Sequence, residues 1–514
     1  MAADAPKRHG VLPARFFRSA TWNYLNSFVA LVLAIVITPI LVRGLGKEAY
    51  GTWTLVTSSV LYYSILQFGL ARATVKFVAE EHAAGDMPSA RRTIATSFLS
   101  LSVPASVLIL VSPALAFLFT VIFDLPDGFK TAAMVLVVLS TVDFAIGMPC
   151  DTFGAALVAL QRYDLLNATA TGVALAQAIS WAVILAFGGG IVELGIATIT
   201  FSLIGNLVRY VMVRRLMGGI PIGPRTFERR KVKPLLSMSG WIALSDTVEI
   251  VTIRIDPLVV ALVAGVPAVA VYTVGQKLAA FVERLTGPAL AMFFPHAAAL
   301  SASGDKEAIR RTLLAGTRLS VGLTLPLALV TSVLAEPALD AWVGEGFDGA
   351  AAVVIFLSLT TLVISFSRVG IYILRGLGNV RFPALIGVFE AVVNLGASVA
   401  LGHLMGIEGV ALGTLVGVTM NHLFVLVPYV CLQLGVSLWT FILTILRAHL
   451  IPCAASLAVG FALRSFAYDG IWQLGVAGIA TVGTYLVLFS VTGVTGDERR
   501  QLGGLVKRKL AGRF

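Results

Sequence analysis

The sequence predicts an all-α polytopic membrane protein with about 14 transmembrane helices. Of its 514 residues, 58% are hydrophobic and 13% are charged, whereas soluble domains carry roughly 25% charged residues. The mean hydropathy is +0.91. Apolar runs of about 20 residues recur along nearly the whole chain, and each is long enough to cross a hydrocarbon core of roughly 30 Å. This composition excludes a soluble enzyme, a secreted disulfide scaffold and a protein with a single membrane anchor.

Each span is placed on an apolar run that is bounded by charged or turn-forming residues. The first run is longer than the apolar region of a signal peptide and ends at Arg43, so it is kept as a span. The expected spans are residues 22–43, 50–70, 93–121, 130–155, 165–188, 191–213, 235–264, 267–298, 312–335, 350–374, 382–404, 407–430, 438–463 and 471–493.

Lysine and arginine residues predict the orientation of these spans. When alternate gaps are compared, 28 of the 38 Lys and Arg residues fall on one side and 4 on the other, and the remaining 6 lie within spans. Because cytoplasmic gaps carry the excess of these residues, both termini are expected to be cytoplasmic. The net charge of +11 is explained by this topology, and nucleic acid is not an expected partner.

The chain repeats itself at an interval of about 218 residues. Residues 37–42 in the first span correspond to residues 255–260 in the seventh, and the loop at 85–93 corresponds to residues 304–312. The interval covers an even number of spans, so the two copies are expected to have the same orientation. Such copies are related by an axis along the membrane normal in transporters that are built from parallel repeats.

The repeat predicts two lobes of six helices each. The expected regions are a cytoplasmic N-terminus (1–21), an N-lobe (22–213), a basic cytoplasmic linker (214–234), a C-lobe (235–431), an extra helix pair (438–493) and a basic cytoplasmic tail (494–514). The linker holds seven Lys and Arg residues and one acid, Glu228. It is either an inter-lobe connection that follows the positive-inside rule or a site for lipid headgroups or a partner.

Short motifs of glycine and turn-forming residues stand out in both halves of the chain. In the first half they are residues 45–53 (LGKEAYGTW), residues 67–70 and the loop at 85–86. In the second half they are residues 378–381 (GNVR), Asn394 with Leu395, and residues 406–413 (GIEGVALG). Over nearly its whole length the chain is similar to the O-antigen and exopolysaccharide branch of the multidrug/oligosaccharidyl-lipid/polysaccharide exporter superfamily.

This resemblance implies a two-lobed transporter in the bacterial inner membrane. It implies that the protein flips polyprenyl-diphosphate-linked oligosaccharides by alternating access, for lipopolysaccharide or exopolysaccharide biosynthesis. The implied partners are the lipid-linked glycan and membrane lipids, and a polysaccharide polymerase and glycosyltransferases are further candidates.

Two alternatives stay open. A multidrug or lipid II-type exporter belongs to the same superfamily, but both branches carry an acidic residue in the first span, and residues 22–42 contain no Asp or Glu. A membrane-embedded polymerase or glycosyltransferase is the second alternative. The outward gaps are short for such an enzyme, and no nucleotide, zinc-protease or nucleophile motif is found. The three cysteines show no disulfide or metal spacing. We therefore expect no catalytic residue, no cofactor and no metal centre.

Ionisable residues inside the spans are the candidate functional residues, because a charge at the bilayer centre costs roughly 2.5–3.5 kcal/mol on insertion scales. Asp246, Glu249 and Asp256 share an arc of roughly 80° on the seventh span. Lys277 and Arg284 share a stripe of the eighth span. Similar depths predict that Asp256 pairs with Lys277, and Arg284 with Asp246 or Glu249. These pairs either hold the C-lobe together or present cations to the substrate.

Arginine is suited to a diphosphate because its planar fork of donors matches the phosphate oxygens. The candidates for binding the diphosphate or the sugar are Arg284, Lys277, Arg254, Arg318 and Arg368. The candidates for ion coupling or internal ion pairing are Asp246, Glu249, Asp256 and Glu390. Because no nucleotide-binding motif is present, transport is expected to use a proton gradient, a sodium gradient or the membrane potential.

Proline and glycine residues add two expectations about the helices. Pro39 and Pro257 occupy equivalent places in the two lobes and are either hinges or static kinks. Gly409, Gly413 and Gly417 recur at four-residue spacing, which predicts a flat helix face for close packing.

Overall fold

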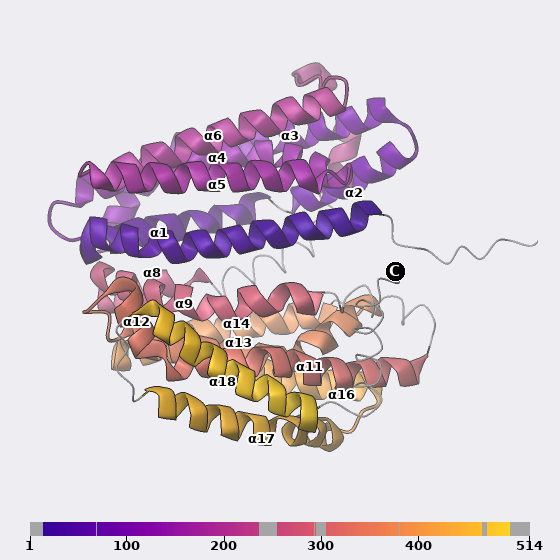
Figure 1. Ribbon diagram of the computed structural model, residues 1–514. Helices are drawn as coiled ribbons and strands as arrows, with labels where there is room; N and C mark the ends of the chain where they lie inside the picture. Colours follow the sequence, from indigo (N-terminus) through magenta and orange to yellow (C-terminus); the bar gives the residue numbers. More distant parts are fainter. Residues whose placement is uncertain are drawn as a thin grey trace, which may run out of the picture. The chain divides into compact units, whose positions relative to one another are not determined.

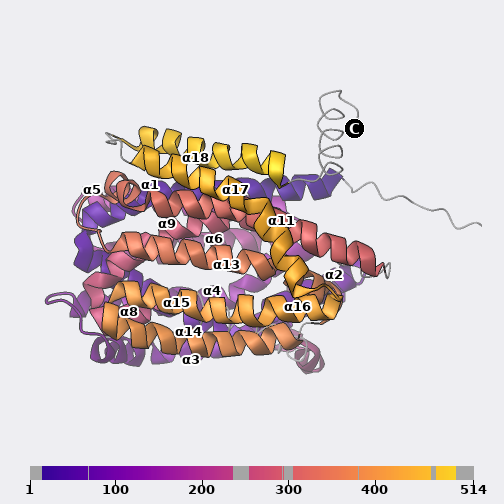
Figure 2. The same ribbon diagram turned by 90° about the horizontal axis from the view of Figure 1, so that it is seen from below.

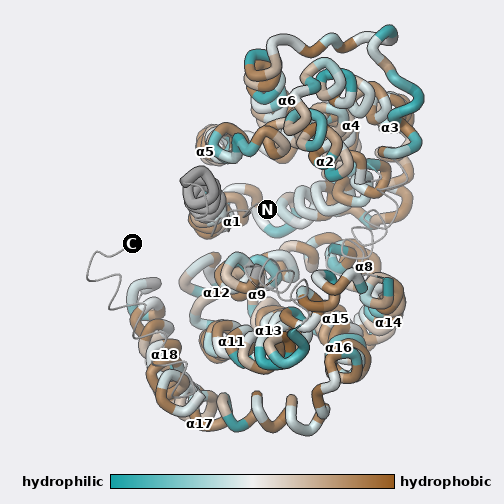
Figure 3. Tube along the Cα trace, turned by 90° about the vertical axis from the view of Figure 1, so that its right-hand side faces the viewer, coloured by the Kyte–Doolittle hydropathy of each residue, from teal (hydrophilic) through white to brown (hydrophobic). Residues whose placement is uncertain are grey.

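The computed structural model describes residues 14–67, 69–235, 254–291, 293, 305–379, 381–464 and 470–493. In these residues all regular secondary structure is helical (Figure 1). Eleven helical segments in this part of the chain are long and apolar enough to cross a membrane. Figure 3 shows hydrophobic residues along most of the helices. The prediction of an all-α polytopic membrane protein is confirmed.

The described helices form two groups along the sequence, one before and one after the linker. Those before it are α1 (Ala14–Val60), α2 (Leu70–Ala83), α3 (Met87–Ile122), α4 (Lys130–Ala159), α5 (Tyr163–Ala186) and α6 (Ile191–Leu216), with 3-10 turns at Leu61–Gln67 and Pro224–Thr226. Those after it are α8 (Asp256–Ala264), α9 (Val266–Ala291), α11 (Lys306–Val333), α12 (Ala335–Val343), α13 (Ala350–Gly376), α14 (Arg381–Met405), α15 (Ile407–Asn421), α16 (Val427–Leu434), α17 (Leu438–Arg464) and α18 (Ile471–Thr492). A π-helical turn at His422–Leu426 joins α15 to α16.

The spans agree with these helices except at three places. One candidate span, Asn26–Gln67, covers most of the two predicted spans 22–43 and 50–70, and the backbone between them is non-helical at Gly46. The predicted spans 235–264 and 267–298 extend into residues that are not described, so the count of 14 stays a prediction. The short helix α12 was not predicted; it lies between the predicted spans 312–335 and 350–374, and its Leu339 and Trp342 side chains are buried.

The chain divides into two compact units. The first unit contains residues 1–37, 63–116 and 135–243, and the second contains residues 38–62, 117–134 and 244–514. In the first unit, Val78, Ile94, Phe153, Leu157 and Met217 form a buried core between α2, α3, α4 and the end of α6.

The second unit has a larger core that includes the C-terminal helix pair. Leu325, Val369, Val430, Phe441 and Phe489 join α11, α13, α16, α17 and α18. Helix α13 runs between α9 and α15, and α14 lies alongside α15 (Figure 2).

The backbone repeats at the interval that the sequence predicts. Gly46 has φ 77° and ψ 171°, and Gly265, 219 residues later, has φ 84° and ψ 165°. Four further pairs of residues with positive φ recur 217 or 218 residues apart, namely Gly128 with Gly346, Gln161 with Gly378, Gly188 with Gly406, and Gly218 with Gly435. A positive φ is a special backbone conformation that glycine adopts most readily. Five pairs of such residues at nearly the same interval therefore indicate that the same turns occur in both halves of the chain.

Side-chain contacts also recur in the two copies. Asp86 Oδ1 accepts from the Ser89 backbone at 2.9 Å, and Asp305 Oδ1 accepts from the Ala308 backbone at 2.9 Å. Both aspartates therefore cap the start of a helix. In addition, the guanidinium groups of Arg91 and Arg310 lie within 3 Å of where a Cβ of Gly218 and Gly435, respectively, would stand.

The glycine face of α15 allows α14 to approach closely. A Cβ on Gly413 would lie within 3 Å of the backbone of Ser398, and one on Gly417 would lie within 3 Å of Asn394. Gly409 meets backbone atoms of α14 in the same way. The prediction that these glycines form a close-packing face is confirmed.

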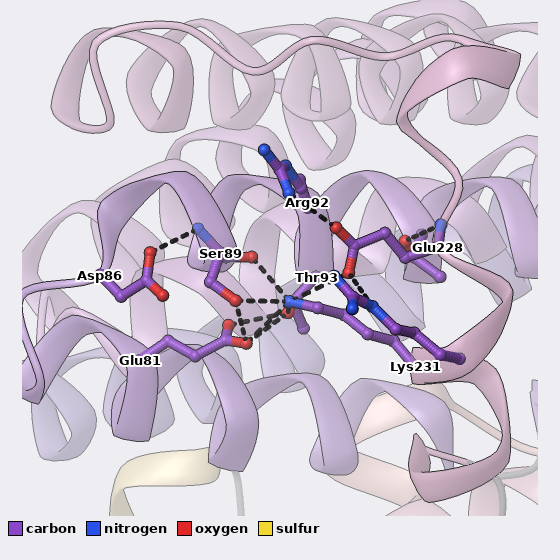
Figure 4. Close-up of polar contacts among 9 residues, drawn as sticks. Glu81, Asp86, Ser89, Arg92, Thr93, Glu228 and Lys231 are labelled. Atoms are coloured by element: carbon purple, nitrogen blue, oxygen red, sulfur yellow. Dashed lines mark hydrogen bonds and ion pairs between the residues drawn. The ribbon is translucent and has the colours of Figure 1, made fainter.

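The linker is fixed to the first unit through Lys231 (Figure 4). Its Nζ donates to Glu81 Oε1 at 2.8 Å, to Ser89 Oγ at 2.7 Å and to Thr93 Oγ1 at 2.7 Å. Glu228 accepts from Arg92 Nη1 at 3.0 Å. The linker therefore contacts the end of α2 and the start of α3, and the Lys and Arg count assigns the connection between these helices to the same side of the membrane as the linker.

Contacts between connections of the second unit likewise join gaps that were assigned to one side. Lys47 Nζ donates to the Gly346 carbonyl at 2.5 Å, and both residues lie in outward gaps. Arg464 is paired with Glu336, again between outward gaps. The linker contacts described above join gaps of the opposite, basic side. The assignment of that side to the cytoplasm stays a prediction.

We expect Gly413→Ala to destabilise the second unit, because the added methyl group overlaps the backbone of α14. Overpacking of this kind costs roughly 1–3 kcal/mol. Gly396→Ala on α14 is the matched control, because a Cβ there meets nothing within 4 Å. Thermal unfolding of the purified variants in detergent tests this expectation. Equal unfolding temperatures for Gly413→Ala and Gly396→Ala would contradict the close-packing role.

The anchoring of Glu228 predicts a pH dependence. Burial raises the pKa of Glu228, but hydrogen bonds from Arg92 and Arg230 and the charge of Lys231 outweigh burial and lower the pKa below its ordinary 4.5. A carboxyl whose folded-state pKa is lowered contributes stability above its unfolded-state pKa and loses it as the pH falls through the folded-state pKa. We expect the unfolding temperatures of wild type and Glu228→Gln to differ at neutral pH and to converge below pH 4.5. A difference that does not change with pH would count against this anchor.

Candidate functional site

Two charged side chains of the second unit form a bidentate pair between α9 and α13. Arg368 Nη1 donates to Glu283 Oε1 at 2.7 Å, and Nη2 donates to Oε2 at 2.6 Å. The Arg368 side chain is 14% exposed, whereas that of Glu283 is 47% exposed. Charge-assisted forks of this kind are among the strong hydrogen bonds in proteins. Arg368 has no acidic neighbour on its own helix, and the structure supplies one from another helix.

Glu283 is partly exposed on α9. The next residue, Arg284, is exposed, and Gly287 and Pro288 follow within about one turn. A Cβ on Gly287 would stand 3.2 Å from Glu283 Oε1 and 3.9 Å from Arg368 Nη1, so the ion pair packs closely against the glycine. A second, exposed cation, Arg284, therefore directly follows the partly exposed carboxylate that is bonded to Arg368.

Asp256 and Lys277 do not form the ion pair that the sequence predicts. Asp256 is buried at the start of α8, where it accepts from Tyr272 Oη at 2.5 Å and from Thr414 Oγ1 at 3.1 Å. Lys277 Nζ instead donates to Tyr50 Oη at 2.7 Å and lies 5.3 Å from the centre of the Tyr50 ring. The predicted pair is wrong, because a similar distance from a turn gives two side chains a similar depth but does not fix their directions.

Glu390 of α14 lies in a buried polar network with α15 and the π-helical turn. The residue is 8% exposed. The Asn421 side-chain amide donates to its carboxylate, and His422 Nε2 lies 3.4 Å from Glu390 Oε2. His422 was not predicted, because the histidines are scattered and show no ligand spacing. The sequence signal that could have identified His422 is that it is an ionisable residue within an apolar span.

The remaining predicted residues are placed as follows. Arg318 is half-buried on α11, and Arg254 is exposed immediately before α8. Asp246 and Glu249, the predicted partners of Arg284, lie outside the described residues. The functional roles assigned to these four residues stay predictions.

The two prolines of the repeat lie in different local structures. Pro39 lies inside α1, whereas Pro257 is buried in the first turn of α8 and follows a bend at Ile255. Proline fits the first turn of a helix without losing a hydrogen bond, whereas an internal proline removes one. Hinge motion at either position stays a prediction.

The described charges support two kinds of chemistry. The fork of Arg368 binds an oxyanion, and a carboxylate beside it is the kind of group that a phosphate oxygen replaces. The buried Glu390–His422 pair can hold a proton. In the part of the chain that the structure describes, no group of three or more His, Cys, Asp or Glu residues is placed to hold a metal ion.

The chain is similar to known proteins over most of its length. A family model described as polysaccharide biosynthesis protein matches residues 40–352. EpsK, an uncharacterized membrane protein of Bacillus subtilis, is 23% identical over 490 residues, which are 93% of this chain and 95% of EpsK. A candidate O-antigen transporter of Shigella flexneri is 22% identical over 422 residues, which cover 79% of this chain and 96% of that protein.

Two solved structures share the fold. The lipid II flippase MurJ in an inward closed conformation has a TM-score of 0.69 and 14% identity, over 92% of this chain and 98% of MurJ. An inward-facing multidrug resistance transporter of the MATE family has a TM-score of 0.69 and 16% identity, over 79% of this chain and 94% of that protein. At these identities the likeness concerns the fold alone. With the family model matching well over half of its length, the chain belongs to the polysaccharide biosynthesis protein family and is a multi-pass membrane protein with the fold of MurJ and the MATE transporters.

Proposed function

We propose that this protein is a flippase that carries polyprenyl-diphosphate-linked oligosaccharides across the bacterial inner membrane by alternating access. The family match and the likeness to a candidate O-antigen transporter support a role in lipopolysaccharide or exopolysaccharide biosynthesis. A fold shared with a lipid II flippase supports a lipid-linked substrate. A multidrug transporter has the same fold, but the absence of Asp and Glu from residues 22–42 favours the glycan branch.

The Glu283–Arg368 pair is the observation that carries this proposal. In the absence of substrate, the Glu283 carboxylate satisfies a mostly buried guanidinium that would otherwise be costly in an apolar environment. The carboxylate is half-exposed, so an incoming diphosphate oxygen can replace it on the Arg368 fork. The exposed Arg284 supplies a second cation for the other phosphate group.

Transport is proposed to draw its energy from an ion gradient or the membrane potential. Asp256 and Glu390 are the candidates for the coupling ion among the described carboxylates, because both are buried. Lys277, Arg254 and Arg318 remain secondary candidates for the glycan or its diphosphate. The linker and both termini are proposed to lie in the cytoplasm, and Pro39 and Pro257 are proposed to bend during the cycle.

We expect the double variant Glu283→Gln/Arg368→Gln to insert and fold normally but to flip a fluorescent polyprenyl-diphosphate-linked sugar about 10-fold or more slowly in proteoliposomes. A charge-assisted bond to the substrate is worth roughly 1.5–3 kcal/mol, and the double change removes both charges of the pair. Arg368→Lys is expected to keep part of the activity, because the charge survives without the fork.

The matched control is Glu336→Gln/Arg464→Gln, which removes another Arg–Glu pair of the second unit, in an outward gap. It is expected to flip at the wild-type rate. Full activity of Glu283→Gln/Arg368→Gln at normal abundance would make that pair scaffolding. No protein-dependent flipping by the wild type would remove the proposed function itself.

A further inference from the structure

A histidine and a glutamate meet inside the second unit, away from the Glu283–Arg368 pair. Glu390 is 8% exposed and His422 is 7% exposed, and their facing atoms, Oε2 and Nε2, are 3.4 Å apart. Neither side chain has another ion-pair partner in the described residues. Burial of a carboxylate in an apolar interior is costly unless the charge is paired or neutralised by a proton.

Ser367 of α13 allows His422 to hold either one or two ring protons. Its Oγ lies 2.5 Å from His422 Nδ1 and 3.2 Å from the Ile364 carbonyl oxygen. When the hydroxyl donates to Nδ1, the imidazole is neutral and Nε2 carries the proton toward Glu390. When the hydroxyl donates to the Ile364 carbonyl, Nδ1–H donates to Oγ and the ring is an imidazolium. Both protonation states are therefore hydrogen-bonded without a change in side-chain position.

Two further features mark this place as more than a packing contact. Asn421 is 2% exposed, and its Nδ2 donates to Glu390, yet its Oδ1 is buried without a hydrogen-bond partner. Unsatisfied buried acceptors are uncommon in folded proteins. The backbone at His422–Leu426 is a π-helical turn, a local distortion that is frequent at functional sites.

The other titratable groups on the surrounding helices are engaged elsewhere. On α13, Arg368 is bonded to Glu283 of α9. On α16, Tyr429 accepts from Asn379. On α8, Asp256 accepts from Tyr272 and Thr414. The remaining titratable side chains on these elements are Tyr372 and Arg375 of α13, Arg381 and His403 of α14, Glu408 of α15 and Cys431 of α16. Among the described residues, the ion-pair partner of Glu390 is His422.

We propose that Glu390 and His422 together form a proton-binding site that couples proton movement to transport. The pair carries no net charge when it holds one shared proton, either as carboxylate with imidazolium or as carboxylic acid with imidazole. Loss of that proton to water leaves a net charge of −1 on the pair. A charged pair is costly when buried, so the proton-loaded pair permits the buried arrangement and the unloaded pair resists it.

This inference rests on the proposed transport function. It names the coupling ion as a proton and adds His422 as the second residue that binds it.

Wild type, Glu390→Gln, His422→Gln and the control His449→Gln are reconstituted with a fluorescent polyprenyl-diphosphate-linked sugar. His449 is also a buried histidine of the second unit, but its Nδ1 lies 2.7 Å from Tyr485 Oη, and no carboxylate among the described residues is ion-paired with it. Flipping is measured with and without an imposed pH gradient. We expect the gradient to accelerate wild type and His449→Gln, and to leave both site variants at their gradient-free rates.

Acceleration of both site variants to the wild-type extent would overturn the proton site. A wild type that flips the sugar at the same rate with and without the gradient would overturn it as well. A wild type that does not flip the sugar at all removes the proposed function. The proton site is then tested by a second measurement that needs no substrate.

The second measurement is the pH dependence of the unfolding temperature from about pH 5 to about pH 8, the range in which histidine titrates. We expect Glu390→Gln, His422→Gln and the double variant to lose the same component of the wild-type pH dependence, because one shared proton is removed in each. His449→Gln is expected to retain it. An unchanged pH dependence in the double variant, or equal and additive losses from the two single changes, would contradict a shared proton.

Discussion

Polar groups that are withdrawn from water must find partners within the protein, and four charged side chains of the second unit illustrate this constraint. Arg368 is held by Glu283, Asp256 by Tyr272 and Thr414, Lys277 by Tyr50, and Glu390 by Asn421 and His422. Each partner comes from a different helix or turn, so these contacts also fix how the helices pack. The close approach of α14 and α15 along Gly409, Gly413 and Gly417 brings Glu390 to Asn421 and His422.

The same constraint connects the structure to the proposed transport. A buried cation that is satisfied by an internal carboxylate is stable without substrate, yet it can exchange that carboxylate for a phosphate oxygen at little net change in charge. The half-exposed Glu283 beside Gly287 is suited to such an exchange. A buried carboxylate that shares a proton with histidine is stable only while the proton is present. The two sites respond to the two species that the proposed transport cycle involves, a lipid diphosphate and a proton.

Much of the fold was predictable because span length, Lys and Arg distribution and the repeat are all local or periodic properties of the sequence. The repeat is visible in the backbone at Gly46 and Gly265, where both copies need positive φ. The site was less predictable, because pairing depends on direction across helices. Glu283 and Arg368 are 85 positions apart, so no helical spacing joins them. Asp256 and Lys277 were predicted to have similar depths, but they contact different neighbours. The role of Glu228 and Lys231 in fixing the linker was hidden by a basic composition that topology alone explains.

The central claim is that the protein moves an anionic lipid-linked glycan whose diphosphate replaces an internal carboxylate. The most direct test is protein-dependent flipping of one glycan on two carriers, polyprenyl diphosphate and polyprenyl monophosphate, by the wild-type protein in otherwise identical proteoliposomes. Because the Arg368 fork and Arg284 are proposed to bind two phosphate groups, the diphosphate carrier is expected to be flipped about 10-fold faster or more, as the loss of one charge-assisted contact predicts. Equal rates for the two carriers, or no protein-dependent flipping of the diphosphate, would contradict the account.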